Sequence, residues 1–314
     1  MTKTAFIFPG QGAQFVGMGK ELADTFASAR AVFQEVDDAL GEPLSELIWN
    51  GSEDDLKLTA NTQPALMAVS IAVVRALETD FGVRIADGVY VAGHSLGEYS
   101  ALAAAGALSV GDTAKLLRFR GESMQKAVAA GEGAMAALLG ATLEQAEAAC
   151  AASGDVCEIA NDNAPGQVVL SGSKAGVEQA VEWSKENGIR KAVLLPVSAP
   201  FHCSLMQPAA DAMAEALAAT SVNAPCIPVY ANVTAAPTSD SDEIRKLLIE
   251  QVTARVRWRE SVEKMAGEGI EQMVECGAGK VLSVMNRRTA KDIVGVYLGT
   301  PSELESFAST QNQA

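Results

Sequence analysis

The stretch VYVAGHSLGE at residues 89–98 decides the fold that we expect for this chain. Residues 89–92 form a short apolar run that predicts a buried strand, and the helix-like segment 96–105 follows directly after the GHSLG turn. A serine between two glycines at such a turn is typical of a nucleophile elbow, and the alternative is a glycine-rich structural turn. In an elbow, backbone N–H groups at the start of the helix point toward an oxyanion that forms at Ser95, and the Leu96 N–H is the natural first donor.

Strand and helix patterns alternate on both sides of this turn. Residues 4–8 form another short apolar run, which is stopped by the loop PGQG, and helical patterns follow near residues 19–40 and 64–80. Asp112 then opens a helix that reaches about residue 129. Strands that alternate with helices predict a mostly parallel, buried sheet.

Residues 129–198 have a different order of elements, βαββαβ, which is that of a ferredoxin-like unit. The strand patterns lie at 134–139, 157–161, 167–171 and 191–197, and the helical patterns lie at 143–152 and 174–187. We therefore expect a large α/β-hydrolase-like catalytic domain of residues 1–128 and 199–314, with residues 129–198 inserted as a ferredoxin-like subdomain. Ser95 and His202 flank this insertion, so they would meet at its junction, where clefts commonly form.

The C-terminal region returns to alternating helices and strands. A helical pattern begins near residue 245, and strand patterns follow at 271–276 and 293–298 on either side of another helix. The tail from Pro301 has low hydrophobicity, and we expect it to be frayed.

Composition narrows the class of protein. The chain has 314 residues, of which 48% are hydrophobic, enough for a sizeable core. Its net charge of -15 argues against nucleic acid as the main partner, because phosphate binding needs a basic surface. The five cysteines are scattered and form no CxxC pair, which predicts free thiols in a reducing compartment and no metal site.

The beginning of the chain lacks a signal-peptide pattern. The longest apolar stretches, near residues 64–74 and 101–108, are too short to span a bilayer. We therefore expect a cytoplasmic protein with no membrane partner.

The chain has only two histidines, His94 and His202. A serine hydroxyl is a poor nucleophile and needs a nearby base to take its proton. His94 precedes Ser95 and its side chain should point away, toward packing contacts, so His202 is the candidate base; the alternative for His202 is a structural histidine. None of the acids Asp155, Asp162 and Asp211 is an evident triad member, so a dyad whose imidazole is held by a carbonyl or an amide is equally open.

Seven motifs recur in order and with matching spacing between about residues 4 and 298. They are FPGQG (8–12), NTQPA (61–65), GHSLGE (93–98), RG (120–121), PGQVV (165–169), PFH (200–202) and GAGKVL (277–282). Together they resemble the malonyl-CoA:acyl carrier protein transacylases of bacterial fatty acid synthesis. The resemblance implies an acyltransferase that takes the malonyl group from malonyl-CoA and passes it to the carrier's phosphopantetheine thiol by a ping-pong mechanism, with no metal or tightly bound cofactor.

The resemblance also implies catalytic roles. Ser95 would be the nucleophile, and His202 the general base and then the acid. Gln11 and Leu96 would supply the backbone oxyanion hole, and the main chain of Gln251 would orient the imidazole.

Further residues would bind the substrate. Arg120 would pair with the free malonyl carboxylate, since a buried guanidinium can hold a carboxylate through two hydrogen bonds. The neighbouring Arg118 could serve by spacing alone, so the choice of Arg120 comes from the resemblance. Gln63 and Asn163 would line the pocket, and Phe201 would crowd an α-methyl group.

The carrier proteins of this pathway are acidic, as the resemblance implies. Residues 245–291 hold ten of the 24 basic residues and six acidic ones. We expect Lys280, Arg287, Arg288 and Lys291 to help dock the carrier or the CoA phosphates; the alternative is a solvated helix face. We expect a monomer.

Two other functions remain open from the sequence. A serine esterase or thioesterase would use Asp162 as its triad acid. A carrier-binding module without catalysis would form no covalent adduct on Ser95.

Overall fold

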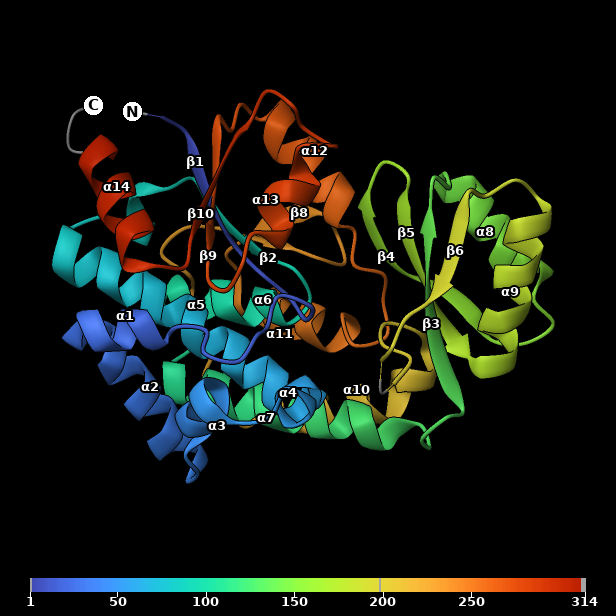
Figure 1. Cartoon of the computed structure of the whole chain (residues 1–314), viewed down its shortest axis with the longest axis horizontal. Helices are drawn as coiled ribbons and strands as arrows, with labels where there is room; N and C mark the ends of the chain where they lie inside the picture. Colours follow the sequence, from blue (N-terminus) through green and yellow to red (C-terminus); the bar gives the residue numbers. More distant parts are fainter. Residues whose placement is uncertain (1, 198, 312–314) are drawn as a thin grey trace.

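The computed structural model describes residues 2–197 and 199–311 and contains two sheets (Figure 1). Sheet A has six strands in the order β10-β9-β1-β2-β7-β8, of which β8 is antiparallel to β7 and the other neighbours are parallel. Its strands are β1 Thr4–Phe8, β2 Tyr90–Gly93, β7 Val229–Ala231, β8 Ala236–Thr238, β9 Gln272–Cys276 and β10 Val294–Leu298. All five residues of β1 are buried, as expected for a central strand that is covered on both faces.

Sheet B has four antiparallel strands in the order β4-β5-β3-β6. They are β3 Gly133–Leu139, β4 Cys157–Ala164, β5 Gln167–Ser173 and β6 Lys191–Leu194. Helices α8 Leu143–Ala152 and α9 Lys174–Glu186 pack together beyond this sheet, and β4 and β5 lie on the side nearer sheet A (Figure 1). This is the expected ferredoxin-like unit. The domain limits at 128/129 and 198/199 stay a prediction, and residues 1, 198 and 312–314 lie outside the described residues.

Helices cover both faces of sheet A. Two apolar clusters form the core there, one built largely around α5 and the other around β1, α12 and α13. The helices are α1 Lys20–Thr25, α2 Ala27–Leu40, α3 Leu44–Asn50, α4 Glu53–Lys57, α5 Thr59–Phe81, α6 Leu96–Ala104, α7 Val110–Ala127, α10 Gln207–Ala218, α11 Ser241–Glu250, α12 Trp258–Gly267, α13 Val281–Asn286 and α14 Pro301–Gln311, with 3-10 turns η1 Ile85–Asp87 and η2 Ser204–Met206.

The expectation of a frayed tail was wrong. Residues 301–311 form helix α14, which packs against α5 and α1. Leu304, Phe307 and Ala308 lie on one face of the helix and are buried. The Glu303 carboxylate accepts hydrogen bonds from the N–H groups of residues 299 and 300 and so caps the start of the helix. The low average hydrophobicity of the tail concealed this apolar stripe.

Strands β7 and β8 and the short helices α3 and α4 were not anticipated, because each is too short to show a clear periodicity. Within the described part of the chain, no helix is both long enough and apolar enough to cross a membrane.

Candidate active site

Ser95 lies in the sharp turn between β2 and α6. Its backbone has a φ of 53°, a left-handed conformation that side chains rarely adopt. The two glycines of the motif make this turn possible. A Cβ on Gly93 would lie 1.9 Å from the backbone of Gly97, and a Cβ on Gly97 would lie 2.3 Å from the Phe8 carbonyl oxygen. The elbow expected from the sequence is therefore present, with its strain held by tight backbone packing.

His202 completes a hydrogen-bonded pair with Ser95. Its Nε2 lies 2.8 Å from the Ser95 Oγ, and its Nδ1 lies 2.8 Å from the backbone carbonyl oxygen of Gln251, just after α11. A carbonyl can only accept, so Nδ1 carries the hydrogen and Nε2 is free to accept the serine proton. His202 is buried and also has a positive φ, of 58°. Burial, and next the nearby Arg120 charge, lower the pKa of His202 to about 3, so the imidazole is neutral near pH 7.

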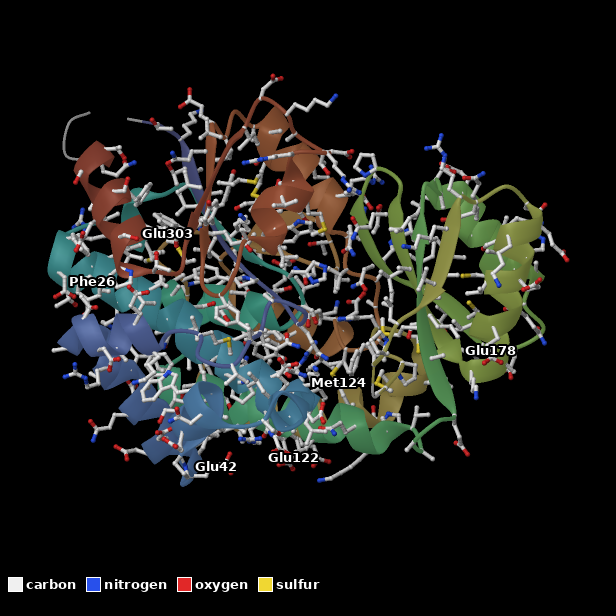
Figure 2. All side chains as sticks on the ribbon, in the orientation of Figure 1. Phe26, Glu42, Glu122, Met124, Glu178 and Glu303 are labelled. Atoms are coloured by element: carbon white, nitrogen blue, oxygen red, sulfur yellow. The ribbon has the colours of Figure 1, made fainter. Side chains whose placement is uncertain are left out.

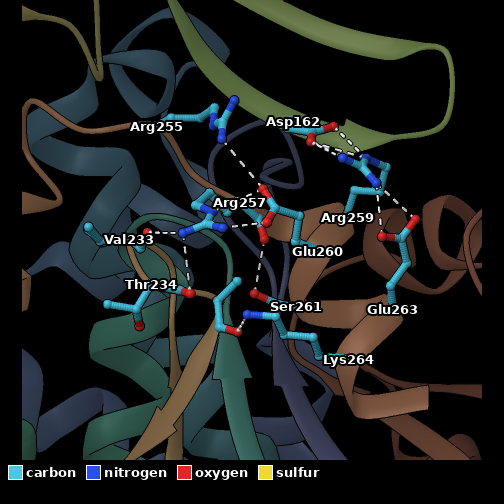
Figure 3. Close-up of polar contacts among 11 residues, drawn as sticks. Asp162, Val233, Thr234, Arg255, Arg257, Arg259, Glu260, Ser261, Glu263 and Lys264 are labelled. Atoms are coloured by element: carbon cyan, nitrogen blue, oxygen red, sulfur yellow. Dashed lines mark hydrogen bonds and ion pairs between the residues drawn. The ribbon is translucent and has the colours of Figure 1, made fainter. Parts of the chain in front are cut away.

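The candidate triad acids do not hold this imidazole. Asp162 on β4 instead receives three hydrogen bonds of 2.8 to 3.0 Å from Arg259 on α12, which also contacts Glu263 (Figure 3). Asp155 accepts from the backbone N–H of residue 156, and Asp211 accepts from Gln207. The Gln251 carbonyl occupies the position that an acid has in a triad, so the arrangement is a Ser-His dyad.

Arg120 reaches the same serine from helix α7. Its side chain is 1% exposed and donates hydrogen bonds to the Gln63 Oε1 at 2.7 Å, the Gln251 Oε1 at 2.9 Å and the Ser95 Oγ at 3.2 Å. Burial lowers the pKa of Arg120, yet a guanidinium keeps its proton in proteins. Its guanidinium carbon lies 5.6 Å from the centre of the Tyr99 ring. A fixed positive charge therefore lies beside the Ser95 hydroxyl.

Arg118, the alternative by spacing, points elsewhere. Pro64 within α5 lacks the N–H that would bond to the Ala60 carbonyl, so that carbonyl is left without its usual helical donor. Arg118 Nη1 donates to it at 2.9 Å and also contacts Asn61, and Nη2 pairs with Glu42. The arginine is thus held on the outer side of α5, away from Ser95.

Asn232 contacts the Ser95 backbone, and Glu98 in turn contacts Asn232. The Asn232 Oδ1 accepts from the Ser95 backbone N–H at 2.8 Å, and its Nδ2 donates to the Gly93 carbonyl at 2.7 Å. The Glu98 Oε2 accepts from the Asn232 backbone N–H at 3.0 Å and from the Gln251 Nε2 at 2.8 Å. Sequence reasoning missed both. Glu98 ended a motif without an assigned role, and Asn232 belonged to none of the motifs.

The two oxyanion-hole candidates come from different elements. Leu96 is the first residue of α6, so its N–H has no carbonyl partner one turn back in the helix. Gln11 follows β1 in a loop, and its side-chain Oε1 accepts from Thr59 at 2.8 Å, which holds the loop against α5. Both residues line the same cavity as Ser95.

His94 makes a separate contact. Its Nε2 lies 2.8 Å from the Asn163 Oδ1 on β4, and its ring lies 5.8 Å from that of Trp258. Burial lowers the pKa of His94. The ring contact with Trp258 is the packing expected for this histidine, and the hydrogen bond to Asn163 is additional.

A cavity of about 300 Å³ connects these groups. Helix α7 contributes Met124, which is labelled near the centre of the molecule in Figure 2. Sheet B contributes both apolar residues, among them Ala137 and Val169, and polar ones, among them Asn161 and Gln167. The other predicted pocket residues, Gln63, Asn163 and Phe201, also line it. The described residues contain no group of three or more His, Cys, Asp or Glu side chains that could hold a metal ion.

Comparison with known proteins agrees with this geometry. The family model "Acyl transferase domain" matches residues 5–304. The malonyl CoA-acyl carrier protein transacylase of Bacillus subtilis (strain 168) is 44% identical over 313 residues, which are 99% of this chain and 98% of that protein. The chain belongs to the malonyl CoA-acyl carrier protein transacylase family.

Solved structures of this transacylase family have the same fold. The acyl-carrier-protein-S-malonyltransferase of Bartonella henselae superimposes with a TM-score of 0.97 at 52% identity, covering 99% of this chain and 100% of that one. A malonyl-transacylase solved in complex with its type II polyketide acyl carrier protein has a TM-score of 0.95 at 37% identity, covering 98% of this chain and 100% of that one. The resemblance found in the sequence motifs is thus confirmed over the length of the chain.

Proposed function

We propose that this transacylase-family member moves the malonyl group from malonyl-CoA to the phosphopantetheine thiol of an acyl carrier protein in fatty acid synthesis. The observation that carries the proposal is the position of Ser95. Its Oγ lies 2.8 Å from a neutral, buried imidazole and 3.2 Å from a buried guanidinium. The first group activates a nucleophile, and the second recognises an acyl group that ends in a carboxylate.

In the first half of the reaction, His202 takes the proton from the Ser95 hydroxyl while Oγ attacks the malonyl thioester carbonyl. The backbone N–H groups of Gln11 and Leu96 stabilise the oxyanion of the tetrahedral intermediate. The intermediate collapses, the C–S bond breaks, and His202 returns the proton to the CoA sulfur. The Gln251 carbonyl stabilises the imidazolium that exists between these steps.

In the second half, the carrier thiol takes the place of CoA. His202 accepts the thiol proton, the sulfur attacks the malonyl ester, and the Ser95 oxygen leaves with that proton. The transfer requires that water reach the ester more slowly than the thiol does.

Arg120 provides the choice of acyl group. A malonyl carboxylate can replace Ser95 and the Gln251 Oε1 as an acceptor for its N–H groups, whereas an acetyl group leaves the buried charge without an anionic partner. Phe201, which lines the cavity, crowds the carbon that carries an α-methyl group in a branched analogue. The Gln63 Oε1 accepts a hydrogen bond from Nη1 of Arg120 and so helps to fix the guanidinium.

Intact-mass measurement tests the proposal. After mixing with malonyl-CoA, a malonyl adduct should form on Ser95 and disappear when a carrier thiol is added. Free malonate instead of malonyl thioester on the carrier would favour a hydrolase, and no adduct would favour a binding module.

The neutral state of His202 gives a pH prediction. Because the pKa of His202 is lowered to about 3, the base stays unprotonated in mildly acidic solution. We expect the rate of Ser95 acylation by acetyl-CoA, which carries no acyl carboxylate, to stay constant between about pH 8 and pH 5. A rate that falls tenfold per unit below about pH 6.5 would indicate an ordinary histidine pKa and contradict the prediction.

Asp162→Asn separates the transacylase from the esterase alternative. Asp162 contacts Arg259 rather than His202, so the substitution should change kcat by less than about threefold, whereas loss of a triad acid costs about 10⁴-fold. Steady-state transfer is measured together with a thermal unfolding curve, which distinguishes a loss of catalysis from a loss of stability at the Asp162–Arg259 contact. A 10⁴-fold loss of kcat in a folded variant would favour the esterase alternative.

The basic residues at α13 support a docking surface for the carrier or the CoA phosphates. A second pocket lined by Lys280, Val284 and Arg288 shares Gln167, Val281 and Met285 with the main cavity. Val281 and Val284 are 47% and 50% exposed, so the surface offers apolar contact between positive charges. We propose that Lys280, Arg287, Arg288 and Lys291 bind the acidic carrier there.

Charge reversal tests this surface. We expect Arg287→Glu combined with Arg288→Glu to raise the carrier KM roughly tenfold and to weaken its dependence on salt. Lys185→Glu on α9 is the control and should leave both unchanged. A rise in the malonyl-CoA KM alone would assign these residues to the CoA phosphates, and no change in either KM would remove the proposal.

The cytoplasmic location and the monomeric state remain predictions from the sequence. Size-exclusion chromatography with light scattering tests the second.

A further inference from the structure

Glu98 is a buried carboxyl group that no step of the mechanism uses. It lies on α6 just beyond the nucleophile and is 2% exposed. Both of its hydrogen bonds, from the Asn232 backbone and the Gln251 side chain, go to Oε2. Oε1 is therefore available to carry a proton without breaking either bond.

Gln251 links this carboxyl group to Arg120. The Gln251 Nε2 donates to Glu98 at 2.8 Å, and its Oε1 accepts from Arg120 at 2.9 Å. One amide thus bridges the two opposite charges. Among the described residues, the Gln251 amide is the direct hydrogen-bond link between Glu98 and the guanidinium, whereas a substrate carboxylate can contact the guanidinium itself.

A count of charges shows what substrate binding does. The other titratable groups that face this region, His202, His94 and Tyr99, are neutral near pH 7 because burial shifts the pKa of each toward its uncharged form. With Glu98 ionised, the empty site is balanced by Arg120. A malonyl carboxylate adds a second negative charge that must share one guanidinium, and two carboxylates in such a site do not both stay ionised.

We propose that Glu98 takes up a proton when a malonyl group occupies the site, so that it sets how the preference for malonyl over acetyl depends on pH. The inference rests on the proposed function. The proton comes from solvent and goes to Glu98 rather than to the substrate, because the substrate carboxylate holds the direct contact with Arg120.

The properties of free Glu98 agree with this assignment. Burial raises its pKa to about 7, against weaker lowering by its hydrogen bonds and by Arg120. The added malonyl charge raises this pKa further, so malonyl binding is linked to proton uptake. Binding is then favoured below the pKa of the free enzyme and weakens as the pH rises above it. The acetyl group carries no charge and has no such linkage.

A simpler role would be a permanently ionised anchor for Asn232 and Gln251. That role predicts neither proton uptake on binding nor a pH-dependent choice of acyl group. The two roles can therefore be distinguished by measurements that a merely structural carboxylate would not change.

The first experiment measures protons directly. A Ser95→Ala variant, which binds malonyl-CoA without being acylated, is titrated by calorimetry near pH 8 in two buffers of different ionisation enthalpy. We expect uptake of a substantial fraction of one proton with malonyl-CoA, none with acetyl-CoA, and none in Ser95→Ala/Glu98→Gln. Zero uptake with malonyl-CoA, or equal uptake in the double variant, would overturn the inference.

The second experiment measures selectivity. The ratio of kcat/KM for malonyl-CoA to that for acetyl-CoA cancels the titrations of His202 and of the CoA phosphates, which both substrates share. In the unmodified protein this ratio should fall above about pH 7, by at most about tenfold per pH unit, and it should be flat in Glu98→Gln. The control is Glu275→Gln, since Glu275 is also buried with a raised pKa but caps α13 instead. The Glu275→Gln variant should show the same fall of the ratio with pH as the unmodified protein.

These outcomes separate two kinds of failure. If malonyl-CoA neither binds Ser95→Ala nor acylates the unmodified protein, the proposed function itself fails. If acylation occurs but the ratio is flat between about pH 6 and 9, only the role of Glu98 fails. If Glu98→Gln does not fold, the proton count in Ser95→Ala and the profile of the unmodified protein still decide the question.

Discussion

His202→Ala should slow acylation of Ser95 by malonyl-CoA by roughly 10⁴- to 10⁶-fold, because removing the base of such a pair costs about as much as removing the nucleophile. The Ser95 Oγ would keep its contact with Arg120 at 3.2 Å, but a guanidinium can only donate and cannot accept the serine proton. The proposed oxyanion donors and substrate-binding residues stay in place, so substrate binding should change far less than the rate. Rapid-quench intact-mass measurement gives the acylation rate directly.

The matched control is Cys203→Ala. Cys203 adjoins His202 and is equally buried, but its thiol contacts the Pro200 carbonyl and not the serine. We expect less than about a threefold change in the rate, since only local packing is altered. If His202→Ala acylated Ser95 within tenfold of the unmodified protein, another base would have to take the serine proton.

The sequence was sufficient for the parts of this site that depend on local chain geometry. Gly93, Ser95 and Gly97 define the elbow because a Cβ at either glycine would collide with nearby backbone. The pairing of Ser95 with His202 followed by elimination in a chain with two histidines. The ferredoxin-like order of sheet B followed from its alternating strand and helix patterns.

What holds the imidazole could not be read from the sequence. A backbone carbonyl such as that of Gln251 has no residue signature, so a dyad and a triad remained equal alternatives until the Nδ1 contact was located. The choice between Arg118 and Arg120 could not be predicted from the sequence either. Arg118 is held away from Ser95 by the Ala60 carbonyl, which Pro64 leaves without its helical donor, and this contact joins two helices that are distant in sequence.

Asn232 and Glu98 show the limit most clearly. Asn232 accepts a hydrogen bond from the Ser95 backbone although the two residues are 137 positions apart in the chain. It can do so because it directly follows β7, which pairs with β2, the strand that leads to Ser95. Glu98 lay within a quoted motif, but its partners, Asn232 and Gln251, lie in parts of the chain that the motif does not describe. The roles of Asn232 and Glu98 are therefore visible only from their tertiary contacts, because local sequence patterns give no sign of them.

Arg120→Met should reverse the choice of acyl group. Methionine keeps much of the buried volume of arginine and removes its charge, so the malonyl carboxylate would enter an apolar site with no cation. Leaving a buried charge without its partner costs about 3–5 kcal/mol, which corresponds to a fall of about 10²- to 10⁴-fold in kcat/KM for malonyl-CoA. The acetyl group has no carboxylate that would lose its cationic partner, so kcat/KM for acetyl-CoA should change by less than about tenfold.

The ratio of the two kcat/KM values is the measurement that isolates this effect, because loss of general folding or of Ser95 reactivity lowers both substrates together. Arg118→Met is the control, since Arg118 lies on the same helix but pairs with Glu42 and the Ala60 carbonyl. It should leave the ratio unchanged while lowering thermal stability slightly.

Removal of the Arg120 charge should also leave Glu98 protonated over a wider pH range, because the cation that favours its ionised form is gone. An Arg120→Met variant that still prefers malonyl by the original margin would show that another group binds the carboxylate. That result would also remove the shared cation on which the proton uptake of Glu98 depends.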